Sequence, residues 1–163
     1  MRVNPQLSVT VAVPVAAQRT WQRKWRDVLH ARQALADAYA GGVLDVDDLT
    51  RRVECFFKTC HELGDWIEES TGHPAKAYAK RPPTLEVCDA VAQTAKHHTR
   101  RQGGSRITAI VVKLHGDQTG IHADIEWTNQ SGKFGSDDAL KLADRCVEEW
   151  RQFFQQHGLN PNA

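Results

Sequence analysis

Hydrophobic residues recur along this chain with two periods, one typical of helices and the other typical of strands. Four segments carry apolar residues three or four positions apart, which predicts amphipathic helices. These predicted helices cover about residues 18–40, 46–70, 85–101 and 137–157. Each has a single apolar stripe, so we expect the four helices to pack against one another around one core.

Residues that favour helix ends and turns separate these segments. Thr84 and Ser136 stand where the N-caps of the third and fourth long helices are expected. Residues 71–83 contain Gly72, Pro74, Pro82 and Pro83, which predicts a connector with a short turn of helix after Pro74.

Alternation of apolar and polar residues predicts strands at 106–115 and 121–128, joined by a short loop into a hairpin. Residues 7–13 alternate in the same way and are a candidate third strand. Because an isolated hairpin is marginally stable in water, this sheet must pack on the helices. We therefore expect an α+β fold, mainly α, with a four-helix bundle-like core and a small antiparallel sheet made of the hairpin 106–128, which strand 7–13 can join.

The length of 163 residues fits one domain spanning residues 1–163, with flexible ends expected at 1–6 and 159–163. No apolar run approaches the roughly 18 residues that a membrane span requires. Ser8 and Thr10 interrupt the apolar segment near the N-terminus, which disfavours a signal peptide. We expect a cytoplasmic protein without a membrane partner.

The four cysteines are Cys55, Cys60, Cys88 and Cys146, and none belongs to a C-x-x-C pair. The last three fall on the apolar stripes of predicted helices, where a thiol behaves as a small hydrophobic group. We expect reduced core cysteines, no metal and no cofactor, and we keep disulfides or a metal as the alternative.

Charge is segregated along the chain, although 21 Lys and Arg nearly balance 20 Asp and Glu. Residues 41–70 hold three basic and eight acidic residues, whereas residues 71–106 hold seven basic and two acidic ones. Opposed blocks of this kind favour self-association. The densest basic stretch is the candidate nucleic-acid or anion-binding surface, and it comprises Lys96, His97, His98, Arg100, Arg101 and Arg106. The alternative is a solvated helix end whose cations complement the helix dipole.

Trp21 and Trp25 stand among the basic residues of the first predicted helix, so they are candidates for stacking on nucleic-acid bases. Their helical spacing favours a place in the core instead.

No P-loop, Rossmann glycine pattern, zinc-protease motif or nucleophile elbow occurs in the chain. His61 and Asp65 lie one helical turn apart, so they can share a face, form a hydrogen bond and orient a general base. If this helix and the next long one are antiparallel neighbours, the pair comes near Asp89 or Gln93. Such a cluster suits proton transfer, anion binding or a structural polar network, and the sequence is compatible with all three roles.

Two of these stretches resemble a loosely defined group of uncharacterised bacterial helical proteins. The first is Cys60-His61 followed by Asp65-Trp66, and the second comprises Cys88, Ala92, Gln93, Lys96 and His97. Gln93 stands where that group usually has Asn. The resemblance covers about residues 50–100 and implies a helical architecture more than an activity.

The chain is more distantly similar to the HEPN superfamily of small helical bundles, which often dimerise and include metal-independent RNases of toxin and defence systems. The HEPN signature is an Arg followed, after four to six residues, by a His on one helix. Arg151 and His157 on the last helix match it, as do Arg23 and His30. The resemblance implies that Arg151 and His157 act on RNA.

Three functions follow from these features. We expect a non-enzymatic protein-interaction module that associates with itself or with a protein partner through its helical bundle. The first alternative is a HEPN-like RNA-binding protein or RNase. The second is a module that binds an anion or a small molecule between the helices at 46–70 and 85–101, around His61, Asp65, Lys96 and His97.

Overall fold

The computed structural model describes residues 20–41, 45–96, 106–118 and 120–163. Its elements follow the order α1 (Trp21–Ala40), α2 (Val46–Thr71), α3 (Ala75–Ala79), α4 (Pro83–Lys96), β1 (Ile107–Asp117), β2 (Gly120–Asn129), β3 (Phe134–Asp138) and α5 (Ala139–His157). The predicted class, mainly helical α+β with a small antiparallel sheet, is confirmed.

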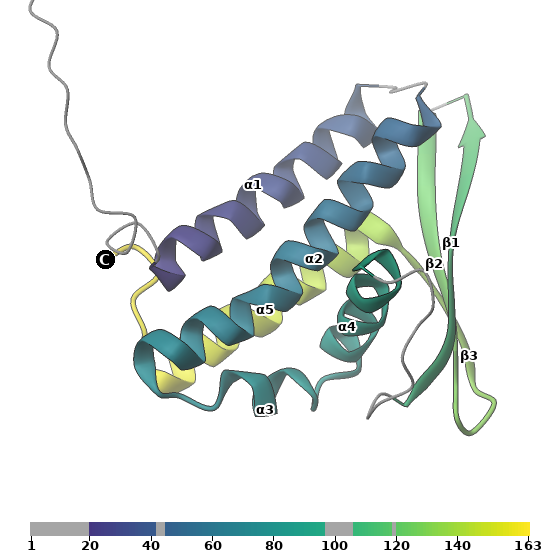
Figure 1. Cartoon of the computed structure of the whole chain (residues 1–163). Helices are drawn as coiled ribbons and strands as arrows, with labels where there is room; N and C mark the ends of the chain where they lie inside the picture. Colours follow the sequence, from purple (N-terminus) through teal and green to yellow (C-terminus); the bar gives the residue numbers. More distant parts are fainter. Residues whose placement is uncertain (1–19, 42–44, 97–105, 119) are drawn as a thin grey trace, which may run out of the picture.

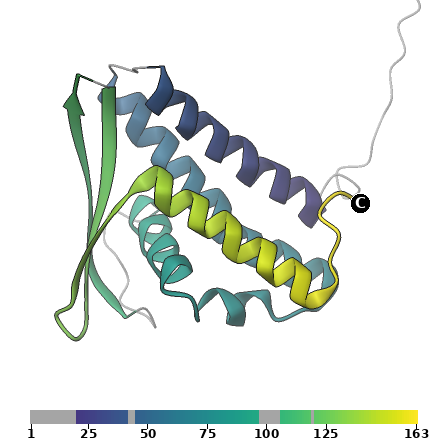
Figure 2. The same cartoon turned by 180° about the vertical axis from the view of Figure 1, so that it is seen from behind.

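Helices α1, α2 and α5 lie side by side along their lengths, and the sheet stands across one end of them (Figure 1). Figure 2 shows α5 on the opposite side of the bundle, with α4 between the long helices and the sheet. Helix α3 lies on the connection between α2 and α4. The layout places α4 where the bundle and the sheet meet.

The long helices begin after short polar N-cap residues. The side chains of these residues accept hydrogen bonds from N–H groups of the first turn, which have no partner within the helix. The Thr20 hydroxyl accepts from the Arg23 N–H at 3.2 Å, and the Asp45 carboxylate accepts from the N–H groups of Asp47 and Asp48. The N-cap of α5 is Asp138, not the predicted Ser136, because the chain between them is still extended as β3. Helix α4 begins one residue before the predicted Thr84, at Pro83, whose fixed φ suits the first helical position.

The sheet has the strand order β1-β2-β3, with both pairs antiparallel. Its hairpin agrees with the prediction, but the described third strand is β3, in a segment where the sequence predicted only a turn before the last helix. Five residues with two adjacent acids do not show a strand pattern by themselves; β3 forms because β2 offers it a free edge. The candidate strand 7–13 lies outside the described residues.

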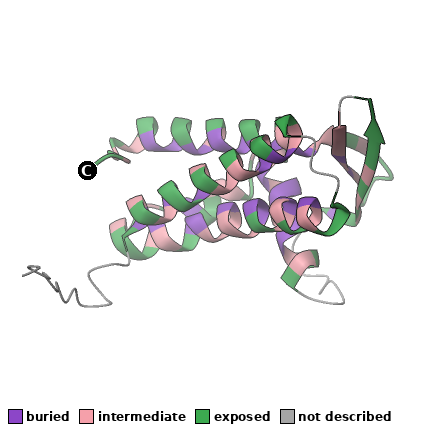
Figure 3. Ribbon diagram, turned by 90° about the horizontal axis from the view of Figure 1, so that it is seen from above, coloured by how far each residue is buried: buried purple, intermediate pink, exposed green. Residues whose placement is uncertain are grey.

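The core fills the space between the long helices, and Figure 3 shows their buried faces turned toward one another. Trp21 and Trp25 are 5% and 3% exposed, and both rings pack on Phe154, so they are core residues and not stacking platforms. The sheet adds Ala123 and Ile125, both fully buried, from the face of β2 that contacts the helices. Among the described residues, no helix combines the length and the apolar character that crossing a membrane requires.

Candidate functional site

Helices α2 and α4 pack together and bring the chemistry-bearing side chains of the two resembling stretches to one place. The Cys88 sulfur lies 3.6 Å from the Phe57 carbonyl oxygen, and further along both helices Lys96 Nζ lies 3.2 Å from Glu62. Gly64 of α2 and Leu85 of α4 line the same cavity, so α4 packs against the middle and second half of α2.

The partner of His61 is Asp89 on α4 and not Asp65 on its own helix. His61 Nδ1 lies 3.2 Å from Asp89 Oδ1, and His61 Nε2 lies 3.5 Å from the Gln93 amide nitrogen. Gln93 also donates to Asp89 at 3.4 Å. The prediction that His61 comes near Asp89 or Gln93 is therefore confirmed. The Asp89 carboxylate orients the imidazole, an arrangement that can hold a proton or a ligand group.

Two ion pairs lie close to this histidine. Asp65 pairs with Lys76 of α3 at 3.3 Å, where 60% of the aspartate side chain is exposed. Glu86 of α4 receives three hydrogen bonds from Arg106, one from its backbone N–H and two from its guanidinium group. These pairs tie α3 and the start of β1 to the rim of one cavity.

The cavity has a volume of about 410 Å³ and lies between α2, α3, α4 and α5. Its rim is charged and includes His61, Asp65, Lys80, Asp89 and Arg106, and its inner wall is formed by thiols, Gly64, Leu85 and the Trp150 ring. A volume in this range holds a small organic molecule.

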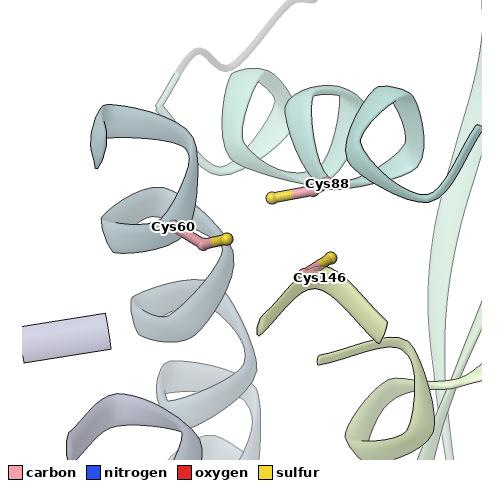
Figure 4. Close-up of side chains that lie close together, drawn as sticks. All are labelled: Cys60, Cys88 and Cys146. Carbon is pink, nitrogen blue, oxygen red and sulfur yellow. The ribbon is translucent and has the colours of Figure 1, made fainter. Parts of the chain in front are cut away.

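Three cysteines converge beside the inner wall of this cavity. Cys60 comes from α2, Cys88 from α4 and Cys146 from α5, and their sulfur atoms all lie within 4.8 Å of one another. Figure 4 shows the three side chains pointing toward a common centre. All three are free thiols, at most 1% exposed, whereas Cys55 is exposed and lies outside the cluster. The sequence placed each of them on an apolar stripe correctly; it could not show that the stripes meet at these thiols.

The three thiols differ in the groups that they contact. Cys88 and Cys146 lie 3.6 Å and 3.8 Å from the carbonyl oxygens of Phe57 and Thr84, which their S–H groups can reach. The pKa of Cys60 is lowered, because the Cys146 and Cys88 thiols can donate to its thiolate form, against the opposing effect of burial. The pKa of Cys88 is raised by the Cys146 and Cys60 thiols and by burial.

The Trp150 indole N–H is buried and has no hydrogen-bond partner among the described residues. The ring is 1% exposed and lies close enough to Cys60 to favour the thiolate form of that cysteine. A buried donor without an acceptor is uncommon in folded proteins.

Of the other predicted site residues that the structure describes, Arg106 lines this cavity, whereas Lys96, Arg151 and His157 do not. Arg151 is exposed and lies 3.8 Å from Glu148, whereas the half-buried His157 ring packs on Phe153 and on His73. The predicted basic surface keeps only its first and last members within the described residues, and both are in ion pairs: Lys96 with Glu62 and Arg106 with Glu86. Its other members, His97, His98, Arg100 and Arg101, lie outside the described residues.

Sequence reasoning missed Glu86, Lys76 and Lys80 as members of the site. No local signal could have found them, because each is an ordinary charged residue near the surface of a helix or turn. Comparison of the chain with protein-family models, with curated proteins and with solved structures finds no match. The site is therefore interpreted from its own geometry.

Proposed function

We propose that the chain is a binding module that holds a small organic acid in the cavity between α2, α3, α4 and α5. The observation that carries the proposal is a cavity of about 410 Å³ with an apolar and thiol-lined inner wall and a charged rim. This deepens the hypothesis of anion or small-molecule binding between α2 and α4. Lys96, which that hypothesis included, is instead in an ion pair with Glu62 outside the cavity lining.

One lysine of the rim favours an anionic group on the ligand. Lys76 and Arg106 are neutralised by Asp65 and Glu86, and Asp89 faces His61. Lys80 forms no ion pair with a described residue. A lysine without an ion-pair partner among the described residues, at the mouth of an apolar cavity, suits a carboxylate attached to an apolar or aromatic body.

Binding of phenylacetate, with its neutral analogue phenylacetamide, tests the proposal. Ligand-observed NMR and calorimetry should detect phenylacetate, and Ala79→Trp should abolish binding of both compounds because the indole fills the cavity. Lys80→Ala should weaken phenylacetate binding about 10- to 150-fold and leave phenylacetamide binding unchanged, since a charge-assisted hydrogen bond contributes about 1.5–3 kcal/mol. Lys58→Ala, outside the cavity lining, is the matched control. Equal binding by the Ala79→Trp variant, or none by the unaltered chain at millimolar ligand, would contradict the proposal.

A second candidate function is self-association through the edge of the sheet that β1 forms. Among the described residues β1 pairs only with β2, so one side of its 11 residues is an edge. Val111 on this strand is 52% exposed, whereas the apolar stripes of the long helices are buried in the core. An exposed, long edge strand is a template for pairing with another chain.

The charge blocks favour self-association less than the sequence predicted. Lys76 and Lys96 of the basic block pair with Asp65 and Glu62 of the acidic block within one molecule. If β1 joins two copies, sedimentation should show a dimer that Val111→Lys dissociates and Val46→Lys does not, although Val46 is also 52% exposed. A monomer at all accessible concentrations would exclude this candidate.

A further inference from the structure

We propose that Cys60, Cys88 and Cys146 form a three-thiolate site for a thiophilic d10 metal ion, Zn²⁺ or Cu(I), with an open coordination position toward the cavity. The proposal rests on the positions of the sulfur atoms and does not depend on the cavity binding an organic acid.

The geometry of the cluster is close to that of a metal site. A Zn–S bond of about 2.3 Å at tetrahedral angles separates two sulfur ligands by about 3.8 Å. The three sulfurs already lie within 4.8 Å of one another, so movements of about 1 Å or less bring them to this spacing. They come from three different helices, α2, α4 and α5, so metal binding would link the bundle at one point (Figure 4).

Packing alone does not require three cysteines at this position. The chain has four cysteines, and three of them meet in a core built otherwise of aliphatic and aromatic side chains. A thiol contributes less apolar surface than Val or Leu and is a weak hydrogen-bond donor. Metal coordination, which needs sulfur, gives a reason for thiols from three helices to converge at one point.

Trp150 provides an independent observation. Its buried indole N–H has no acceptor among the described residues, and Trp150 lines the same cavity as Cys60 and Cys88. A metal-bound thiolate keeps negative charge and accepts hydrogen bonds from its surroundings. Binding of a metal would therefore satisfy a donor that is otherwise left without a partner.

The ligand set selects the metal. Three sulfur donors without oxygen exclude Mg²⁺ and Ca²⁺ as natural occupants and favour Zn²⁺ or Cu(I). Cu(I) is satisfied by three thiolates, whereas Zn²⁺ requires a fourth ligand. Cys60 and Cys88 line the cavity, so water or a bound molecule can reach that fourth position.

The binding step balances without any redox change. The metal ion forms three metal–sulfur bonds, and each thiol releases its proton to solvent, so up to three protons leave per ion bound. Uptake should therefore weaken as the pH falls.

The experiment uses the full untagged chain, fully reduced and freed of metal, titrated separately with Zn²⁺ and with Cu(I) under anaerobic conditions. Native mass spectrometry should show one ion per chain, with a Kd below about 1 μM for at least one metal. Cys88→Ala should weaken binding at least about 100-fold, and Cys55→Ala is the matched control that should bind as the unaltered chain does. Ala79→Trp, which tests the cavity proposal, should retain metal binding.

X-ray absorption of the loaded, unaltered chain avoids reliance on variants that fold poorly. It should show three sulfur neighbours at about 2.3 Å, with one nitrogen or oxygen neighbour in addition if the ion is Zn²⁺. Binding of neither metal, coordination by nitrogen and oxygen alone, or equal affinity in a folded Cys88→Ala variant would overturn the proposal.

Discussion

The indole ring of Trp127 lies directly over Gly135, its partner across the β2–β3 pair, and leaves no room for a side chain there. A Cβ at position 135 would stand 2.3 Å from two carbons of that ring. The ring is held in place by its Nε1, which donates to Asp137 at 3.2 Å. The glycine thus lets the short strand β3 pair with β2 beneath a large half-buried side chain.

Gly135→Ala should therefore destabilise the protein. We expect a loss of about 1–3 kcal/mol in the free energy of unfolding, because the Trp127 ring must leave its position and its hydrogen bond. Urea denaturation measures this loss. Gly116→Ala in β1 is the matched control: its Cβ would meet neighbours at 3.8 Å, an ordinary contact, so a change within about 0.5 kcal/mol is expected. Equal effects of the two substitutions would contradict the packing argument.

Tyr39 should make stability fall at alkaline pH. Its hydroxyl lies 3.1 Å from both the Ala123 carbonyl oxygen and Asp138 Oδ2, and it accepts from the Ala123 N–H at 3.0 Å. Burial, with Asp138 nearby, raises the pKa of Tyr39 from 10.0 to about 12. The neutral form is favoured in the folded state, so this stabilisation is complete below pH 10 and is lost as the pH rises toward 12.

The difference in unfolding free energy between the unaltered chain and Tyr39→Phe reports this effect, because other titrating groups cancel. We expect the advantage of Tyr39 to shrink by about 1 kcal/mol between pH 9 and pH 11, after allowance for its partial exposure. A constant difference over that range would show that the hydroxyl titrates normally.

Glu62 should act as an acid-sensitive link between three helices. Its carboxylate lies 2.6 Å from Lys24 Nζ of α1 and 3.2 Å from Lys96 Nζ of α4. Burial acts to raise the pKa of Glu62, but the two lysines outweigh it and the pKa is lowered. The stabilisation is therefore present above the ordinary pKa of glutamate and is lost as the pH falls through the lowered value.

Glu62→Gln should cost a few tenths to about 1 kcal/mol at pH 7, since 37% of the Glu62 side chain is exposed, and nothing at pH 2. Chemical denaturation at the two pH values makes the comparison. Glu54→Gln is the control, because the one ion pair of Glu54 with a described residue is that with Lys58, at 3.9 Å. A cost that persists unchanged at pH 2 would mean that Glu62 acts through packing.

The thiols should react in two classes. Cys55 is exposed, whereas Cys60, Cys88 and Cys146 are buried in the native chain. A thiol reagent such as DTNB should modify one thiol quickly and the remaining three only after denaturation. Cys55→Ala should remove the fast phase; a fast phase that survives this substitution would show that the cluster opens readily.

The helices, the hairpin and most of the core could be predicted, because each follows from local periodicity. Trp21, Trp25 and the three clustered cysteines occupy the buried positions that their spacing predicted. Strand β3 could not be predicted, since its pairing depends on an edge that β2 supplies. For the site, the sequence identified the stretches around His61 and Asp89 but did not decide which residue contacts His61. It did not predict the cavity or the close approach of the three thiols.

The sequence by itself determined which face of each helix is buried and which segments alternate as strands, because those properties depend on residues a few positions apart. Only the tertiary structure decided which buried faces meet. The packing of α4 against α2 brings Cys88 to Cys60 and Asp89 to His61, and α5 adds Cys146 and Trp150 to the same place. Periodicity specifies a face but not its partner, so the cavity and its three thiols arise from how the helices pack.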